Sequence, residues 1–442
     1  MTFEIARAIL YSILKTKERR TKMGSFKRVK AACYTVNVCM AITGNLSPLL
    51  FLTFRSMYGI SYSLLGLLVL INFFTQLSVD LAFSFFSHRF NIEKAVKLTP
   101  VINVAGLLIY ALWPFVFPNH VYAGLVIGTI VFSASSGFAE VLISPVIDAI
   151  PSENPEREMS KLHSIYAWGC VGAVGVATLF LLAFGGEHWQ WLALLFVSVP
   201  LTACILFFKA KLPALATPER ASGAFAMLKR KGIWLCFFAI FLGGACEVTM
   251  AQWCSSYLEQ ALGISKVWGD IFGVALFAVA LGLGRSLYAK YGKNIGKVLF
   301  LGAVGAALCY LVAALTTIPF LGLFACAFTG FCVSMLWPGS LSVASERFPM
   351  GGVFIFAFMA AGGDMGAAVG PQLVGVVTDV ISGSSACAEL AQKLGLSVEQ
   401  FGMKAALLVG MLFAIAAIFI YLAVWKGQKK GLPLAEKVEK SE

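Results

Sequence analysis

Charged residues are scarce in this sequence. Asp, Glu, Lys and Arg make up 13% of the 442 residues, whereas 59% of the residues are hydrophobic. A soluble protein of this composition would lack the polar residues needed to cover its surface, so the sequence predicts an integral membrane protein. A membrane-spanning helix needs about 20 apolar residues, and the chain is long enough for roughly twelve of them.

Other signatures are also missing. The 11 cysteines lie singly within apolar segments and form no CxxC pair, which indicates core residues and not a metal site or a disulfide framework. The sequence has no phosphate-binding loop, no metal-ligand cluster and no spacing typical of a catalytic triad. We therefore predict that the protein is not an enzyme and uses no metal or cofactor. Its basic residues are dispersed over many loops, which argues against nucleic acid as a partner.

Apolar runs between polar breaks predict twelve spans. They cover residues 31–54, 60–84, 97–117, 121–147, 162–184, 188–208, 233–258, 268–289, 296–316, 320–343, 352–378 and 403–425. The predicted organisation is an amphipathic, basic N-terminal segment (1–30), a six-helix half (31–208), a basic linker (209–232), a second six-helix half (233–425) and a tail (426–442).

The distribution of basic residues predicts the orientation. With both termini in the cytoplasm, all but four of the 34 Lys and Arg residues fall on the cytoplasmic side, the exceptions being Arg55, Lys266, Lys393 and Lys404. This asymmetry follows the positive-inside rule. It predicts a multi-pass protein of the plasma (inner) membrane with the lipid bilayer around it.

Short motifs recur in the two halves. Gly59-Ile-Ser61 matches Gly263-Ile-Ser265, and the Gly137-Phe138 pair precedes Pro145 as Gly330-Phe331 precedes Pro338. A third match pairs the glycine-rich stretches at 167–172 and 361–366. The order and similar offsets indicate two halves in parallel register, with a central site between them. At the place of Glu140 in the first half, the second half has Val333.

These residues resemble the major facilitator superfamily. The stretch "GLGRSLYAKYGKN" (282–294) is similar to its cytoplasmic signature, and "SHRFNIEK" (87–94) is similar to a degraded copy. Gly137, Glu140 and Pro145, followed by "KLHSIYAWG" (161–169), resemble the fucose:proton symporter branch. The resemblance implies an all-α membrane protein with twelve transmembrane helices in two six-helix halves. The sequence departs from the branch at Ser144, where the branch has Asn, and it lacks the acidic residue of span one.

Three carboxylates within the spans are candidates for ion coupling, namely Glu140, Glu247 and Asp364. Ionisable groups inside a membrane are costly and therefore functional candidates. No Lys or Arg is expected at the same depth, so each carboxylate would be neutralised by a proton or by Na⁺, and its loading would control whether the site can close. The alternative is a permanently protonated side chain that is hydrogen-bonded between helices.

A gating role is predicted for a second group. Asn72, Gln76 and Asp80 share one face of span two. Asp80 is expected near the cytoplasmic end of that span, where it would act in gating or in packing, with Arg285 as a partner. His163, near the start of span five, is a candidate for a gate or a proton path, and the alternative, which the sequence favours, is simple packing at the helix end.

Amides, hydroxyls and indoles suit a sugar, because an aromatic ring stacks on its apolar face while polar groups bind its hydroxyls. The candidates are Asn45, Ser144, Gln252, Trp168, Trp253 and Trp337, although each indole taken singly is better explained as a core or interface residue. The sequence thus predicts a monomeric secondary active transporter that takes up a small polar solute, with a sugar preferred, together with H⁺ or Na⁺. The alternative is an exporter or antiporter of an organic or cationic solute on the same fold.

Overall fold

The computed structural model describes residues 26–86, 91–151, 155–213, 228–348 and 352–429, and these ranges contain helices and no strand. The predicted amphipathic segment at the N-terminus lies almost entirely outside them. Among the described helices, 11 are long and apolar enough to cross a membrane, and the number rises to 12 when a bent pair is counted as one span. The predicted fold class, an all-α membrane protein with twelve spans, is confirmed.

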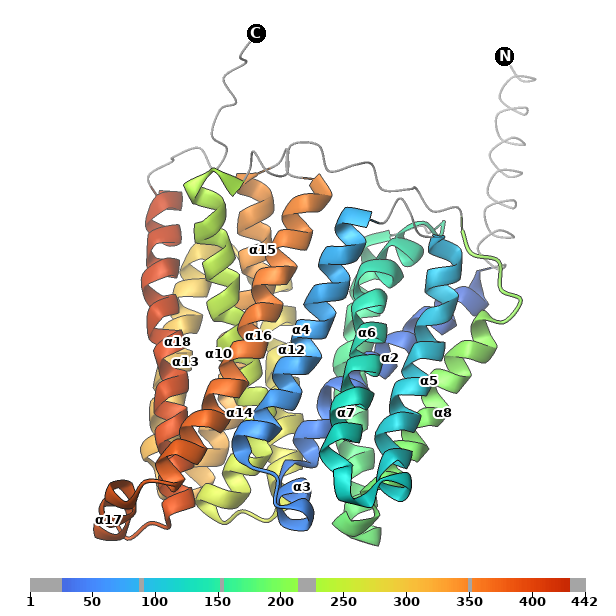
Figure 1. The fold of residues 1–442 in the computed structure, drawn as a ribbon. Coiled ribbons are helices and arrows are strands. Elements are labelled where there is room, and N and C mark those ends of the chain that lie inside the picture. The colour runs from blue at the N-terminus through green and yellow to red at the C-terminus, as the bar shows by residue number, and fades with distance from the viewer. Residues whose placement is uncertain (1–25, 87–90, 152–154, 214–227, 349–351, 430–442) are drawn as a thin grey trace, which may run out of the picture.

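The helices form one bundle (Figure 1). In the first half they are α2 (Lys27–Leu49), α3 (Phe51–Tyr58), α4 (Tyr62–Phe86), α5 (Ile92–Val116), α6 (Val121–Asp148), α7 (Pro155–Phe184) and α8 (Trp189–Phe207). In the second half they are α10 (Lys231–Leu262), α11 (Lys266–Trp268), the π-helical η4 (Gly269–Ala275), α12 (Leu276–Tyr291), α13 (Ile295–Leu315), α14 (Pro319–Val333), α15 (Leu336–Arg347), α16 (Gly352–Ser382), α17 (Ser385–Lys393) and α18 (Val398–Lys429).

The two halves lie side by side, and α4 and α16 run along each other where they meet (Figure 1). Glycines permit this contact: a Cβ on Gly375 would lie 2.4 Å from the carbonyl oxygen of Tyr62. We call the face where α18 ends and α10 begins the terminal face, which is the upper one in Figure 1. The opposite face carries α3 and α17.

Prolines interrupt two spans and release backbone carbonyls near the middle of the bundle. Proline has no N–H to donate to the carbonyl four residues earlier, so Pro48 leaves Gly44 and Pro338 leaves Ser334 without a helical partner. The span that contains Pro48 bends by 44° between α2 and α3, and the span that contains Pro338 breaks between α14 and α15. Both carbonyls are taken up by side chains of the candidate site.

Candidate functional site

Three carboxylates from three helices converge in the half of the bundle nearer the terminal face. They belong to Asp80 on α4, Glu140 on α6 and Asp364 on α16, and one oxygen of each lies within 4.8 Å of the others. Asp80 is 2% exposed and Asp364 is 3% exposed. Since α16 belongs to the second half and α4 and α6 to the first, this carboxylate cluster joins the two halves.

Local packing explains why Glu140 meets Asp80. The hydroxyl of Ser133 on α6 donates to Oδ1 of Asn72 on α4 at 2.6 Å, which aligns the polar faces of the two helices. One turn further on, a Cβ on Gly137 would lie 2.9 Å from the Cβ of Val79, so the helices are in close contact there. The next turn brings the carboxylate of Glu140 beside that of Asp80.

The described residues offer this cluster no hydrogen-bond donor or cation that would balance its charge. Both carboxylate oxygens of Asp80 and Oδ2 of Asp364 are buried without a donor. The carboxylates of the two aspartates lie close together, with one oxygen of each within 4.8 Å of the other. Ionised carboxylates only accept hydrogen bonds, so a proton on one of them would supply the missing donor. The arrangement can therefore hold a proton, or a cation that prefers oxygen ligands.

Asp80 was predicted to pair with Arg285, and this prediction is wrong. Arg285 binds a different carboxylate: its Nη2 lies 3.2 Å from Oε1 and 3.4 Å from Oε2 of Glu247. The prediction that Glu247 lacks a cationic partner is therefore wrong as well. The physical reason is that the long side chain of Arg285 extends from α12 to the middle of α10, where it donates to Glu247.

The Arg285–Glu247 pair is held in place by the broken span. Nε of Arg285 donates to the carbonyl oxygen of Ser334 at 3.0 Å, which is the carbonyl that Pro338 releases. A Cβ on Gly284 would lie 2.2 Å from the hydroxyl of Ser334, so α12 is in close contact with the break. The side chain of Arg285 nevertheless stays 41% exposed, so part of the guanidinium is accessible within the bundle.

Polar groups of both halves lie near this ion pair. Nε2 of Gln252 donates to the carbonyl oxygen of Gly44 at 3.3 Å, which is the carbonyl that Pro48 releases. Asn45 and Tyr166 both contact the thiol of Cys170, and Arg285 is within electrostatic range of it. Tyr166 is also within range of both Glu140 and Glu247, and it is 39% exposed. It is therefore near both the carboxylate cluster and the ion pair.

Two of the predicted indoles lie away from this region. Trp253 is 1% exposed, packs against Phe51 and Tyr62, and donates from Nε1 to the carbonyl oxygen of Pro371 at 2.9 Å. Trp168 is 70% exposed and lies eleven residues before Leu179, which is 67% exposed, so the two share the outer face of α7. Neither position gives the indole contact with the central polar groups.

The remaining predicted residues have different surroundings. Trp337 packs over Gly363, where an added Cβ would lie 2.4 Å from its ring, and so supports α16 beside Asp364. Ser144 follows Glu140 by one turn of α6 and is partly exposed. The side chain of His163 lies outside the described part of the structure. The roles assigned to these residues from the sequence stay predictions.

Contacts between the halves also close the opposite face, and the sequence did not single out their acidic members. Arg55 on α3 binds Glu399 on α18 at 2.5 Å, and Gln260 binds the other oxygen of the same carboxylate at 2.7 Å. The carboxylate of Asp379 accepts the backbone N–H groups of Tyr62 at 3.1 Å and Ser63 at 2.6 Å, across the seam.

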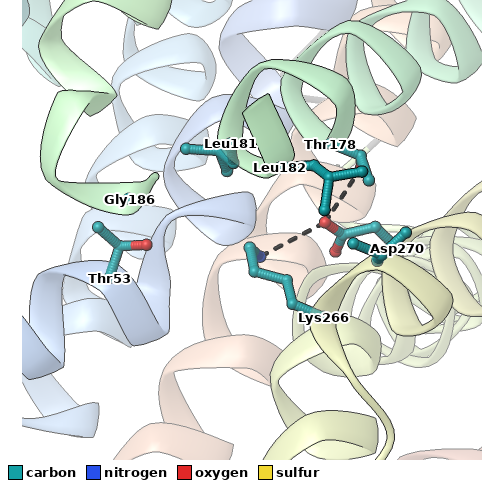
Figure 2. Close-up of a pocket in the computed structure, with 8 residues that line it drawn as sticks. Thr53, Thr178, Leu181, Leu182, Gly186, Lys266 and Asp270 are labelled. Carbon is teal, nitrogen blue, oxygen red and sulfur yellow. Dashed lines mark hydrogen bonds and ion pairs between the residues drawn. The ribbon is translucent and has the colours of Figure 1, made fainter. Parts of the chain in front are cut away.

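A third closing contact lies beside a cavity of about 260 Å³, which is lined by both halves (Figure 2). Asp270, on the π-helical turn, is fully buried. Its carboxylate accepts from Thr178 of the first half at 3.1 Å and from Ser255, and it lies 3.5 Å from Nζ of Lys266. Of these partners, only Thr178 belongs to the other half.

The comparisons with known proteins agree with this architecture. The family model described as Major Facilitator Superfamily matches residues 33–371. A search of curated protein sequences finds no match. Among solved structures, a bacterial homologue of the human lysosomal transporter Spinster is 13% identical, with a TM-score of 0.70, and the match covers 91% of this chain and 97% of that one.

Two sugar transporters are also similar in structure. A D-xylose–proton symporter is 14% identical with a TM-score of 0.68, covering 88% of this chain and 97% of that one. A variant of the E. coli fucose:proton symporter FucP is 15% identical with a TM-score of 0.54, covering 89% and 99%. At these identities the likeness shows the fold alone.

Proposed function

Because the chain belongs to the major facilitator superfamily, we propose that it is a secondary active transporter that moves a small polar solute together with a proton by alternating access. The observation that carries this proposal is the carboxylate cluster of Asp80, Glu140 and Asp364, which we assign as the coupling site. The positive-inside pattern supports placement in the plasma membrane with the terminal face toward the cytoplasm.

Electrostatics explain how the cluster would couple ion binding to movement. Two full charges 4.8 Å apart repel by roughly 3–4 kcal/mol at an effective dielectric constant of about 20. Three ionised carboxylates at this separation would therefore force α16 away from α4 and α6. A bound proton removes part of the repulsion and lets the halves stay together on the terminal side. Loading the site thus favours closure there, and unloading favours opening.

A proton suits this cluster because it supplies a hydrogen-bond donor to oxygens of Asp80 and Asp364 that have none among the described residues. The central polar groups favour a hydroxylated solute such as a sugar. The amides of Asn45 and Gln252 and the hydroxyl of Tyr166 provide donors and acceptors that suit hydroxyl groups. The structurally similar xylose and fucose symporters carry such solutes with protons, which supports the proposal by analogy.

Uptake into proteoliposomes tests the proposal. The full-length chain is reconstituted, and a panel of labelled hexoses, pentoses and sugar acids is offered with a pH gradient and a Na⁺ gradient imposed separately. We expect an acidic exterior to drive at least one solute above its equilibrium concentration, and the Na⁺ gradient to have no effect. Accumulation under the Na⁺ gradient alone would show that the coupling ion is Na⁺ and not a proton. Solute-driven proton release would indicate an antiporter, and movement of no solute would refute the proposal.

The contact between Thr178 and Asp270 predicts a variant that opens the opposite face (Figure 2). Thr178→Val removes the hydrogen bond that Thr178 donates to Asp270 from the other half, while keeping the side chain's shape. The loss of about 0.5–1.5 kcal/mol should raise the open population several-fold. A cysteine introduced at Thr53 should then react faster with a membrane-impermeant maleimide. The control is Thr202→Val, because Thr202 bonds only within its own helix, to Ser198. Equal labelling in both variants would contradict the prediction.

A further inference from the structure

The Arg285–Glu247 ion pair is the feature that the coupling mechanism leaves unexplained. The three carboxylates of the cluster already provide a site for the coupling ion. Burying two charged groups in the middle of a membrane bundle is costly, and a buried ion pair contributes little net stability. Stability alone therefore does not explain this pair. Arg285 is also the one described arginine that bonds to a carboxylate within the spans of the second half. A role in solute recognition would explain its presence.

The geometry of the guanidinium leaves part of it available. Nε is committed to the carbonyl oxygen of Ser334, which fixes the plane of the group, and Nη2 is committed to Glu247. No described residue accepts a hydrogen bond from Nη1, and 41% of the side chain is exposed. Arginine presents its donors as a rigid fork that matches a carboxylate or a phosphate. An oriented, partly unoccupied fork of this kind is suited to an anion.

The surroundings of the ion pair indicate what else the ligand carries. Asn45, Tyr166 and Cys170 of the first half lie across the seam, and Cys170 is within electrostatic range of Arg285. Gln252 contributes an amide whose Oε1 finds no donor among the described residues. A ligand that bridges the halves would thus meet a cation on one side and neutral hydrogen-bonding groups on the other. Hydroxyl groups next to one anionic group fit this arrangement.

We propose that the transported solute is a hydroxylated organic anion, of the sugar-acid class, whose carboxylate binds Arg285 in competition with Glu247. This inference rests on the proposed function and narrows its solute. In the empty protein Glu247 satisfies the guanidinium. When the solute arrives, its carboxylate takes the available donors and weakens the bond to Glu247. Tyr166, which lies within range of both Glu247 and Glu140, is placed to transmit the change toward the coupling site.

Ligand-induced thermal stabilisation of the purified full-length protein tests the assignment without any gradient. The probes are matched pairs: glucose with glucuronate, galactose with galacturonate, and glucitol with gluconate. We expect at least one acid to raise the melting temperature of the wild type, and its neutral partner to have no effect. In Glu247→Gln the competing carboxylate is gone, so the acid should bind more tightly. Arg285→Gln should weaken its binding by about tenfold or more, as expected for lost charge-assisted hydrogen bonds.

Two further variants keep the result interpretable. The double variant Arg285→Gln/Glu247→Gln removes both charges, so no buried carboxylate is left unpaired if Arg285→Gln alone misfolds. Arg28→Gln is the control, because Arg28 is exposed and bonds only to the carbonyl oxygen of Ile205. The assignment is overturned if neutral partners stabilise as well as acids, if the double variant keeps the response, or if no acid stabilises Glu247→Gln. Binding without proton-driven accumulation would instead refute only the proposed coupling.

Discussion

Replacing Glu140 by Gln should abolish proton-driven accumulation of solute in proteoliposomes, so that its concentration becomes equal on both sides. Exchange of solute in the absence of a gradient should persist. The reason is that glutamine has the shape of a protonated glutamate but cannot release the proton. The cluster then carries one negative charge fewer in every state. Each pair of ionised carboxylates repels by roughly 3–4 kcal/mol, and this repulsion is what distinguishes the empty protein from the loaded one. The variant loses the part of it that involves residue 140.

The measurement is the ratio of internal to external labelled solute under an acidic exterior, compared with counterflow at equal pH. Glu187→Gln is a suitable control, because Glu187 is an exposed carboxylate in the short 3₁₀ segment before α8. Asp80→Asn and Asp364→Asn should give the same separation of accumulation from exchange if the three residues act as one site. Wild-type accumulation by Glu140→Gln would exclude Glu140 as a coupling residue.

The fold was largely predictable because its signals are strong and local. Spans need about 20 apolar residues, and the basic residues divide sharply between the two sides, so span number and membrane character follow from the sequence. What a hydropathy pattern does not give is the continuity of each span. The bend after Pro48 and the break before Pro338 divide two predicted spans into four helices. The prolines were visible, but the side chains that occupy the freed carbonyls come from other helices.

The site was predictable only in part, because it depends on contacts between distant helices. Periodicity placed Asp80 on one face of its span with Asn72 and Gln76, and the structure brings Glu140 of another span beside it. Nothing in the spacing along the chain indicates that Asp364 joins them from the second half. Arg285 falls inside the predicted span 268–289, but no pattern along the chain indicates that its side chain pairs with Glu247 on α10. Asp379 and Glu399, which hold the two halves together at the opposite face, lie near helix ends. Acidic residues are common there, so the sequence gives no signal that these two have a special role.

Replacing Gly366 by Ala should lower the thermal stability of the protein and disturb coupling together. A Cβ at Gly366 would lie 1.9 Å from the carbonyl oxygen of Phe241, which is backbone of α10 and cannot rotate away. Overpacking of this kind typically costs about 1–3 kcal/mol, and a backbone clash belongs at the upper end. To relieve it, α16 must move away from α10. Asp364 lies two residues earlier on the same helix, so the shift would displace its carboxylate from Asp80 and Glu140.

The matched control is Gly172→Ala on α7, where an added Cβ meets nothing within 4 Å. Alanine is the better helix former by about 0.5–1 kcal/mol, so this variant should be as stable as the wild type or slightly more stable. Thermal unfolding in detergent and proton-driven accumulation should therefore both fall in Gly366→Ala and be retained in Gly172→Ala. If Gly366→Ala loses stability but keeps full accumulation, the close contact between α16 and α10 serves packing alone. In that case the position of Asp364 is fixed by α4 and α6.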